Sequence, residues 1–120
     1  IQYTHARIAA ILRRAQSLEI DLDFNTDAVN DIHPRGLELI HKLTEYPKTI
    51  DHAAAEYSPA LVAQYVYDLA KTYNGFYQEV PIFNEDSTEL VKFRVALSAA
   101  VSGVINSAMG LLGIDVPERM

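Results

Sequence analysis

The chain has 120 residues, of which 49% are hydrophobic and 22% charged, and its formal net charge is −6. A chain of this length holds one hydrophobic core, so we expect a single domain over residues 1–120. The absence of cysteine excludes disulfide frameworks, thiolate zinc sites and cysteine nucleophiles. The acidic balance argues against sequence-independent nucleic-acid binding, although it leaves room for a local basic stripe.

Targeting signals are not evident in the sequence. No apolar run approaches the roughly 18 residues that a membrane helix needs, and no basic and apolar leader opens the chain. We therefore expect a cytoplasmic protein that does not contact a membrane. The chain begins with Ile1 inside a helical pattern that has no capping residue before it. We interpret it as a piece of something larger.

The first predicted helix covers residues 1 to about 17. Its apolar residues recur at helical spacing and predict one buried face, made by Ile1, Ile8, Ile11, Leu12 and Ala15. A second stripe borders that face on a helical wheel and consists of Tyr3, Arg7, Ala10 and Arg14. In one interpretation the arginine stems cover the edge of the core. In the other, an aromatic ring beside guanidinium groups binds unpaired bases and their phosphates.

The next predicted elements are a connector and a helix. Residues 18–34 are acidic and lack sustained periodicity, so they predict a long connector, with room for a short helical turn. Pro34 ends the connector and suits the first position of a helix over residues 35–46. We expect that helix to stop at Pro47 and to be followed by a short alanine-rich stretch. Its predicted inward residues are Leu37, Ile40, Leu43 and Tyr46.

Two long helices are predicted in the second half of the chain. The first has Ser58 as N-cap and runs to about Tyr77. The second begins with Asp86 or Ser87 as cap, has Glu89 in a capping-box position, and ends on Gly113 in a left-handed conformation. We expect these two helices to pack as an antiparallel spine. No alternating segment predicts a strand, so the fold class is an all-α bundle of about five helices.

Tyrosines and histidines are the remaining candidates for chemistry. Four tyrosines lie on the first long helix, and we expect most of them to line the bundle and one or two to face a ligand: Tyr65, Tyr67, Tyr73 and Tyr77. The four histidines form no HExxH pair and no i,i+3 or i,i+4 pair, so we expect no metal site. An alternative function is a helical protein-interaction or phosphotransfer bundle in which His41, beside Lys42, accepts a phosphoryl group.

Catalytic motifs are absent from the sequence. It contains no G-x-G-x-x-G, P-loop or nucleophile elbow. Its paired carboxylates, Asp21 with Asp23 and Glu85 with Asp86, lie in predicted connectors. We interpret them as solvated side chains or helix caps and not as acid–base groups. We expect no active site within these 120 residues.

Three segments resemble one protein family. They are QYTHARIAAILRRA at 2–15, YVYDLAKTYNGFYQEVPI at 65–82 and GLLGIDVPERM at 110–120. They closely resemble the carboxy-terminal anticodon-binding domain of arginyl-tRNA synthetase, and the resemblance runs from end to end. The Asp-Ala-Leu-Arg signature of this domain class is not literal here; the comparable place is FRVALSAAV at 93–101.

The resemblance implies a class I aminoacyl-tRNA synthetase anticodon-binding domain that docks on the anticodon stem and loop of the tRNA for arginine. A separate catalytic domain, absent from these residues, would join arginine to the tRNA with ATP, and family members of this kind are commonly monomers. By position in the family motifs, Tyr3 and Met120 border the anticodon loop. The further candidate tRNA-binding residues are His5, Arg7, Ala10, Arg14, Asn74 and Arg94.

Overall fold

The computed structural model describes residues 2–20, 32–83 and 88–113. In these residues it contains five α-helices and no strand. In chain order the helices are α1 (Gln2–Ser17), α2 (Pro34–Thr44), α3 (Tyr46–Ala55), α4 (Pro59–Glu79) and α5 (Thr88–Leu111). The predicted all-α class is therefore confirmed.

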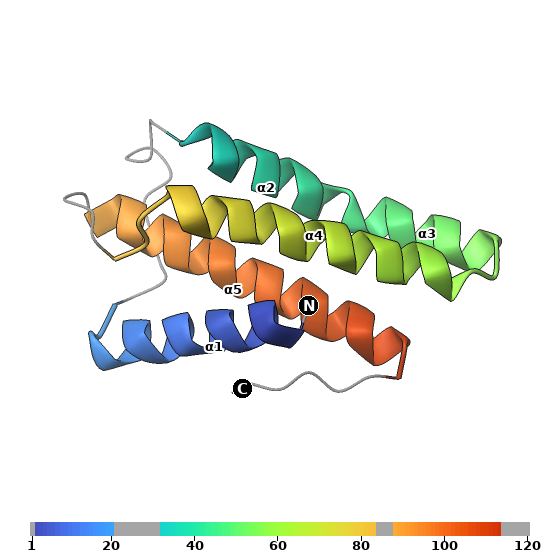
Figure 1. Cartoon of the computed structure of the whole chain (residues 1–120), viewed down its shortest axis with the longest axis horizontal. Helices are drawn as coiled ribbons and strands as arrows, with labels where there is room; N and C mark the ends of the chain where they lie inside the picture. The colour runs from blue at the N-terminus through green and yellow to red at the C-terminus, as the bar shows by residue number, and fades with distance from the viewer. Residues whose placement is uncertain (1, 21–31, 84–87, 114–120) are drawn as a thin grey trace.

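The two longest helices form the centre of the molecule (Figure 1). Helices α4 and α5 pack against each other and run in opposite directions, which confirms the expected antiparallel spine. On one side α1 packs along α5, and on the other side α2 and α3 follow one another along α4. Each outer helix therefore covers part of the spine with one apolar face.

The core lies between these helices and is made mostly by the spine. Leu69, Tyr73 and Phe76 of α4 and Val95 and Ile105 of α5 are almost completely buried. Burying one such aliphatic or phenylalanine side chain stabilises the fold by about 1.5–3 kcal/mol relative to leaving it exposed. From the outer helices, the core receives Ile8, Ile11, Ala15, Leu39 and Ala53.

The helix ends follow the predicted chemistry at Pro34 and Gly113 and depart from it at Pro47. Ser58 occupies the predicted N-cap position of α4 but makes no side-chain capping hydrogen bond. Pro34 occupies the first turn of α2 and Gly113 follows α5 with φ +73°, as expected. The prediction that Pro47 ends a helix is wrong. The chain turns at Glu45, and Pro47 lies in the first turn of α3, where its missing N–H leaves no intrahelical bond unmade. The predicted α5 cap and residues 21–31 of the connector lie outside the described residues.

The buried face of α2 also differs from the prediction. Leu37 was expected inside, but its side chain is 53% exposed, and Gly36 and Leu39 are the buried positions. Gly36 packs tightly against Ile32, which precedes α2, and makes an ordinary contact with α4. A Cβ at this position would meet Ile32 Cγ2 at 3.1 Å and Phe76 Cε2 at 3.7 Å. Gly36 and Leu39 therefore face the bundle, and Leu37 lies on the exposed side of α2.

Helix α5 corrects the expectation that no apolar segment approaches the length of a membrane helix. By length and composition alone, α5 (Thr88–Leu111) is apolar enough to cross a membrane. It packs against α1, α2 and α4, and its buried Arg94 and Ser98 make hydrogen bonds inside the bundle. The same length and composition are typical of the central helix of a bundle, and this is the environment that α5 has here.

Candidate nucleic-acid interface

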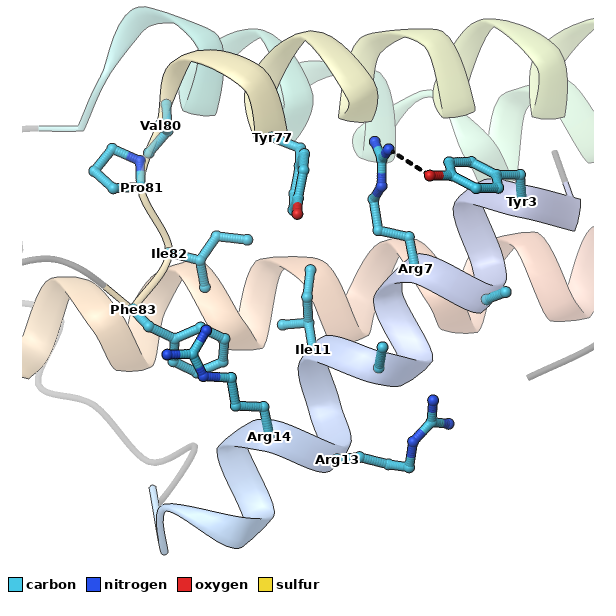
Figure 2. A pocket seen from close by; sticks show the side chains of 12 residues that line it. Tyr3, Arg7, Ile11, Arg13, Arg14, Tyr77, Val80, Pro81, Ile82 and Phe83 are labelled. Atoms are coloured by element: carbon cyan, nitrogen blue, oxygen red, sulfur yellow. Dashed lines mark hydrogen bonds between the residues drawn. The ribbon is translucent and has the colours of Figure 1, made fainter. Parts of the chain in front are cut away.

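An open groove of about 1010 Å³ lies between α1 and the segment that follows α4 (Figure 2). One wall is the stripe predicted from the helical wheel. The other wall is Tyr77, near the end of α4, together with residues 80–83. The structure thus places four predicted residues in one groove: Tyr3, Arg7, Ala10 and Arg14.

The centre of the groove is a cation between two aromatic rings. The Arg7 guanidinium carbon lies 4.7 Å from the centroid of the Tyr3 ring and 4.3 Å from that of the Tyr77 ring. Arg7 Nη2 also donates a hydrogen bond to the Tyr3 hydroxyl at 3.0 Å. Cation–π contacts of this kind are worth about 0.5–1 kcal/mol at exposed sites. Tyr3 is therefore held in place although its side chain is 58% exposed.

Asn74 of α4 holds the Arg7 guanidinium by a hydrogen bond. Its Oδ1 atom accepts hydrogen bonds from Arg7 Nη1 at 3.4 Å and from Thr4 Oγ1 at 3.3 Å. Both donors lie on α1, one turn apart. Asn74 thus links α1 to α4 and leaves the Tyr3 ring free to face the groove.

The other end of the groove repeats the pairing of guanidinium and ring. The Arg14 guanidinium carbon lies 4.6 Å from the centroid of the Phe83 ring. Ala10, between the two arginines on α1, is exposed and leaves the middle of the groove wide. Arg13 also borders the groove, and none of the described lining residues is acidic. The groove is therefore positively charged in a chain whose formal charge is −6.

The remaining candidate tRNA-binding residues lie elsewhere. His5 is 7% exposed and Arg94 is 8% exposed, and neither lines the groove. Arg94 Nη1 donates a hydrogen bond to the Pro81 carbonyl at 2.8 Å, so its charge is directed at the backbone of the groove wall. Met120 lies outside the described residues.

The wall formed by residues 80–83 was not predicted from the sequence. Tyr77 belonged to the group of tyrosines from which a ligand contact was expected, but its pairing with Arg7 was not foreseen. These contacts join residues about seventy positions apart, and no local pattern reports such a pairing. Pro81, which cannot continue a helix, was the available signal that a non-helical segment follows α4.

The tyrosines inside the bundle have a structural role. Tyr73 and Tyr65 are 0% and 4% exposed, whereas Tyr67 and Tyr77 are 57% and 39% exposed. Burial raises the pKa of both Tyr73 and Tyr65 to about 12. The Tyr65 hydroxyl donates to the Lys42 carbonyl at 2.6 Å, and the Tyr73 hydroxyl lies 2.8 Å from Ser98 Oγ.

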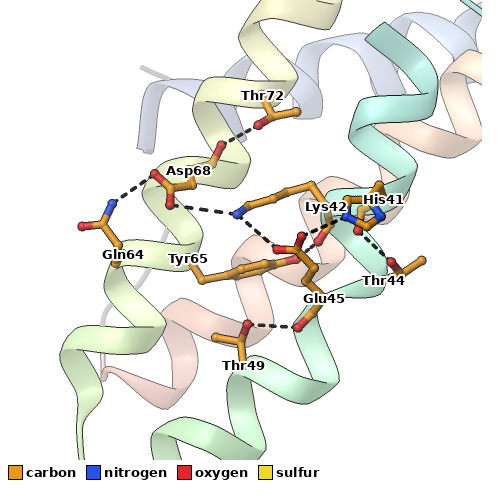
Figure 3. Close-up of polar contacts among 9 residues, drawn as sticks. All are labelled: His41, Lys42, Thr44, Glu45, Thr49, Gln64, Tyr65, Asp68 and Thr72. Atoms are coloured by element: carbon orange, nitrogen blue, oxygen red, sulfur yellow. Dashed lines mark hydrogen bonds and ion pairs between the residues drawn. The ribbon is translucent and has the colours of Figure 1, made fainter. Parts of the chain in front are cut away.

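His41, the alternative reactive group, lies in a polar cluster around the junction of α2 and α3 (Figure 3). Its side chain is 79% exposed, and Nε2 lies 3.3 Å from Glu45 Oε1. Lys42 Nζ lies 3.4 Å from the same carboxylate, 3.9 Å from Asp68 and 5.1 Å from the centroid of the Tyr65 ring. The Lys42–Asp68 pair joins α2 to α4, and the pairs with Glu45 are local to the end of α2. Ion pairing alone therefore explains the cluster. In the described part of the chain, no group of three or more histidine, aspartate or glutamate side chains is arranged to hold a metal ion.

Comparison with known proteins agrees with this geometry. The whole chain, residues 1–120, matches the family model described as the DALR anticodon binding domain. Two arginine–tRNA ligases, from Flavobacterium psychrophilum and Amoebophilus asiaticus, are 50% and 46% identical to it over its full length. The chain covers 19% and 20% of these two proteins, so it spans about a fifth of the length of the curated relatives that it matches.

A solved structure gives the same answer for the fold. Thermus thermophilus arginyl-tRNA synthetase superimposes with a TM-score of 0.86 at 28% sequence identity, over 99% of this chain and 20% of that one. The solved structure supports the five-helix fold, and the family model matches the same chain from end to end. The chain belongs to the DALR anticodon-binding domain family.

Proposed function

We propose that this chain is the anticodon-binding domain of an arginine–tRNA ligase and that its groove receives the anticodon stem and loop of the tRNA for arginine. One observation carries the proposal. The exposed Tyr3 ring is held by Arg7 in a groove whose described lining residues include three arginines and no acidic side chain. The identity of the relatives supports the choice of tRNA.

The chemistry of the groove suits a single-stranded loop. Unpaired bases bind by stacking on aromatic rings and guanidinium planes, and their phosphates pair with cations. In the proposed complex Tyr3 stacks on a base, Ala10 leaves space for it, and Arg14 contacts a phosphate. Asn74 keeps Arg7 in position for this contact. His5 and Arg94, which are buried, support the surface from below, and Met120 borders the loop.

The rest of the proposal concerns the longer protein. The chain spans about a fifth of its curated relatives, so a class I catalytic domain elsewhere in the parent would use ATP to attach arginine. ATP would belong to that domain, and the 120 residues described here would be catalytically inert alone. We propose that the parent is a monomer located in the cytoplasm.

A titration with two RNA hairpins tests the proposal. One hairpin carries an arginine anticodon loop, and the other has the same stem with a changed loop. We expect the chain to bind the first hairpin more tightly at every salt concentration, because base contacts distinguish loops whereas phosphate contacts do not. Equal affinity for both hairpins would contradict the proposal and favour the alternative in which the stripe docks a protein.

A further inference from the structure

A line of hydrogen bonds between buried side chains lies behind the groove wall that Tyr77 and residues 80–83 form. Arg94 Nη1 donates to the Pro81 carbonyl at 2.8 Å. The Ser98 hydroxyl donates to the Arg94 carbonyl at 2.9 Å, and it lies 2.8 Å from the Tyr73 hydroxyl. Ser98 and Tyr73 are completely buried, and Arg94 is 8% exposed. The line therefore connects α4, α5 and the segment after α4 through side chains that are largely or completely buried.

Each end of this line touches a residue that lines the groove. At one end, Pro81 is itself a lining residue. At the other end, the Tyr73 ring packs on the Tyr77 ring, with centroids 6.5 Å apart and planes inclined by 33°. Tyr77 in turn stacks on the Arg7 guanidinium. A shift of either buried end would move one wall of the groove.

The segment over residues 80–83 depends on this support because it is not helical. Val80 and Ile82 are 1% and 6% exposed and anchor it through their side chains. The Pro81 carbonyl between them has no helical partner, and Arg94 supplies the donor. Held this way, the segment presents the Phe83 ring to Arg14.

A buried cation is not needed for stability alone. Removing a charge from water is expensive, and well-packed apolar replacements of buried ionic groups are often neutral or stabilising. An apolar residue at position 94 could fill the same space but could not hold the Pro81 carbonyl. The hydrogen bond to the Pro81 carbonyl is therefore a contribution of the guanidinium that an apolar side chain would not make.

We propose that Arg94 and Tyr73 are positioning residues of the groove, which act on a bound RNA loop through the 80–83 segment and through Tyr77. The inference rests on the proposed function for its RNA partner, but its first test needs no RNA. The test compares four variants of the full 120-residue chain: Arg94→Met, Arg94→Lys, Tyr73→Phe and the control Tyr65→Phe.

The control is closely matched to Tyr73→Phe. Tyr65 and Tyr73 lie on the same helix, both are buried, and each hydroxyl makes one interhelical hydrogen bond. Tyr65, however, bonds the Lys42 carbonyl and does not touch the groove. We expect the two phenylalanine variants to lose similar thermal stability. If only Tyr73→Phe changes RNA binding, the cause is then the location of the Tyr73 hydroxyl behind the groove and not a general loss of stability.

The first experiment measures the free protein by NMR. In Arg94→Met we expect lower backbone order parameters at Ile82 and Phe83 and loss of the Overhauser contact between the Phe83 ring and the Arg14 side chain. Arg94→Lys, which keeps a donor, should restore part of both signals, and Tyr65→Phe should change neither. An unchanged segment in a folded Arg94→Met would overturn the proposal.

The second experiment measures binding to the two hairpins. We expect Arg94→Met and Tyr73→Phe to weaken binding to the arginine anticodon loop by roughly 2- to 30-fold, the range typical of residues that act through others. Binding to the changed loop should be unaffected. If Tyr73→Phe and Tyr65→Phe have the same effect on loop discrimination, the positioning role of Tyr73 is wrong.

If the unaltered chain binds neither hairpin, the proposed function fails, and the NMR result still decides the proposal for Arg94. Should Arg94→Met not fold, Arg94→Lys and Tyr73→Phe carry both tests.

Discussion

Replacing Tyr3 by alanine is the most direct test of the groove. The change removes the ring that is exposed beside Arg7 and with it the hydroxyl that accepts a hydrogen bond from Arg7 Nη2 at 3.0 Å. Because 58% of the side chain is exposed, little core packing is lost and the fold should persist. The effect on binding is therefore separable from an effect on stability.

The expected magnitude follows from stacking. One base stacked on an aromatic side chain is worth about 1–3 kcal/mol by alanine substitution. Since about 1.4 kcal/mol is a factor of ten, Tyr3→Ala should weaken binding to the arginine anticodon hairpin by roughly 5- to 150-fold. Loss of the Tyr3 contact also frees Arg7 from one of its two rings, which adds to the effect. In the full parent enzyme we expect kcat/KM for tRNA charging to fall by about tenfold or more.

Tyr67→Ala is the control, because Tyr67 has nearly the same exposure, 57%, and does not line the groove. Affinity is measured by fluorescence anisotropy of the labelled hairpin and aminoacylation by incorporation of labelled arginine. An intact parent carrying Tyr3→Ala that charges its tRNA with unchanged kcat/KM would refute the reasoning. So would a matching loss of affinity in Tyr67→Ala.

Three further outcomes follow from the structure. Arg14→Ala should lower the slope of log affinity against log salt by about 0.7, as expected when one phosphate contact to a single strand is lost; an unchanged slope would mean that Arg14 contacts no phosphate. Leu69→Ala, at a completely buried position, should lower the free energy of unfolding by about 2–5 kcal/mol in urea titrations, and a loss within error of zero would contradict the described core. Burial raises the pKa of Tyr73 from its ordinary 10.0 to about 12. The stability that the buried neutral hydroxyl contributes is therefore fully present below pH 10 and is lost as the pH rises toward about 12. Tyr73→Phe should therefore flatten the alkaline fall in stability, and an identical pH profile would exclude this coupling.

The sequence carried enough information for the helices and for one wall of the groove. Helical periodicity separates the Ile8 face of α1 from the stripe that contains Tyr3 and Arg7. The residues of both faces lie in one continuous segment, so their spacing alone places them. The other wall could not be predicted in this way. Phe83 reaches Arg14 only through the packing of the whole bundle, and that packing depends on contacts distant in sequence. Leu37 was misplaced for a similar reason, since the packing of α2 against α4 and α5, which are distant in sequence, decides that Gly36 and Leu39 are its buried positions.

Three arginines in one groove that has no acidic residue among its described lining have a consequence for how a polyanion approaches the molecule. Among the described residues, three of the nine lysines and arginines line the groove, which leaves six basic against eight acidic side chains outside it. A nucleic acid that arrives at another face meets net repulsion, and one that arrives at the groove meets attraction. Encounters at other faces are therefore disfavoured, and electrostatic attraction biases the first contacts toward the groove.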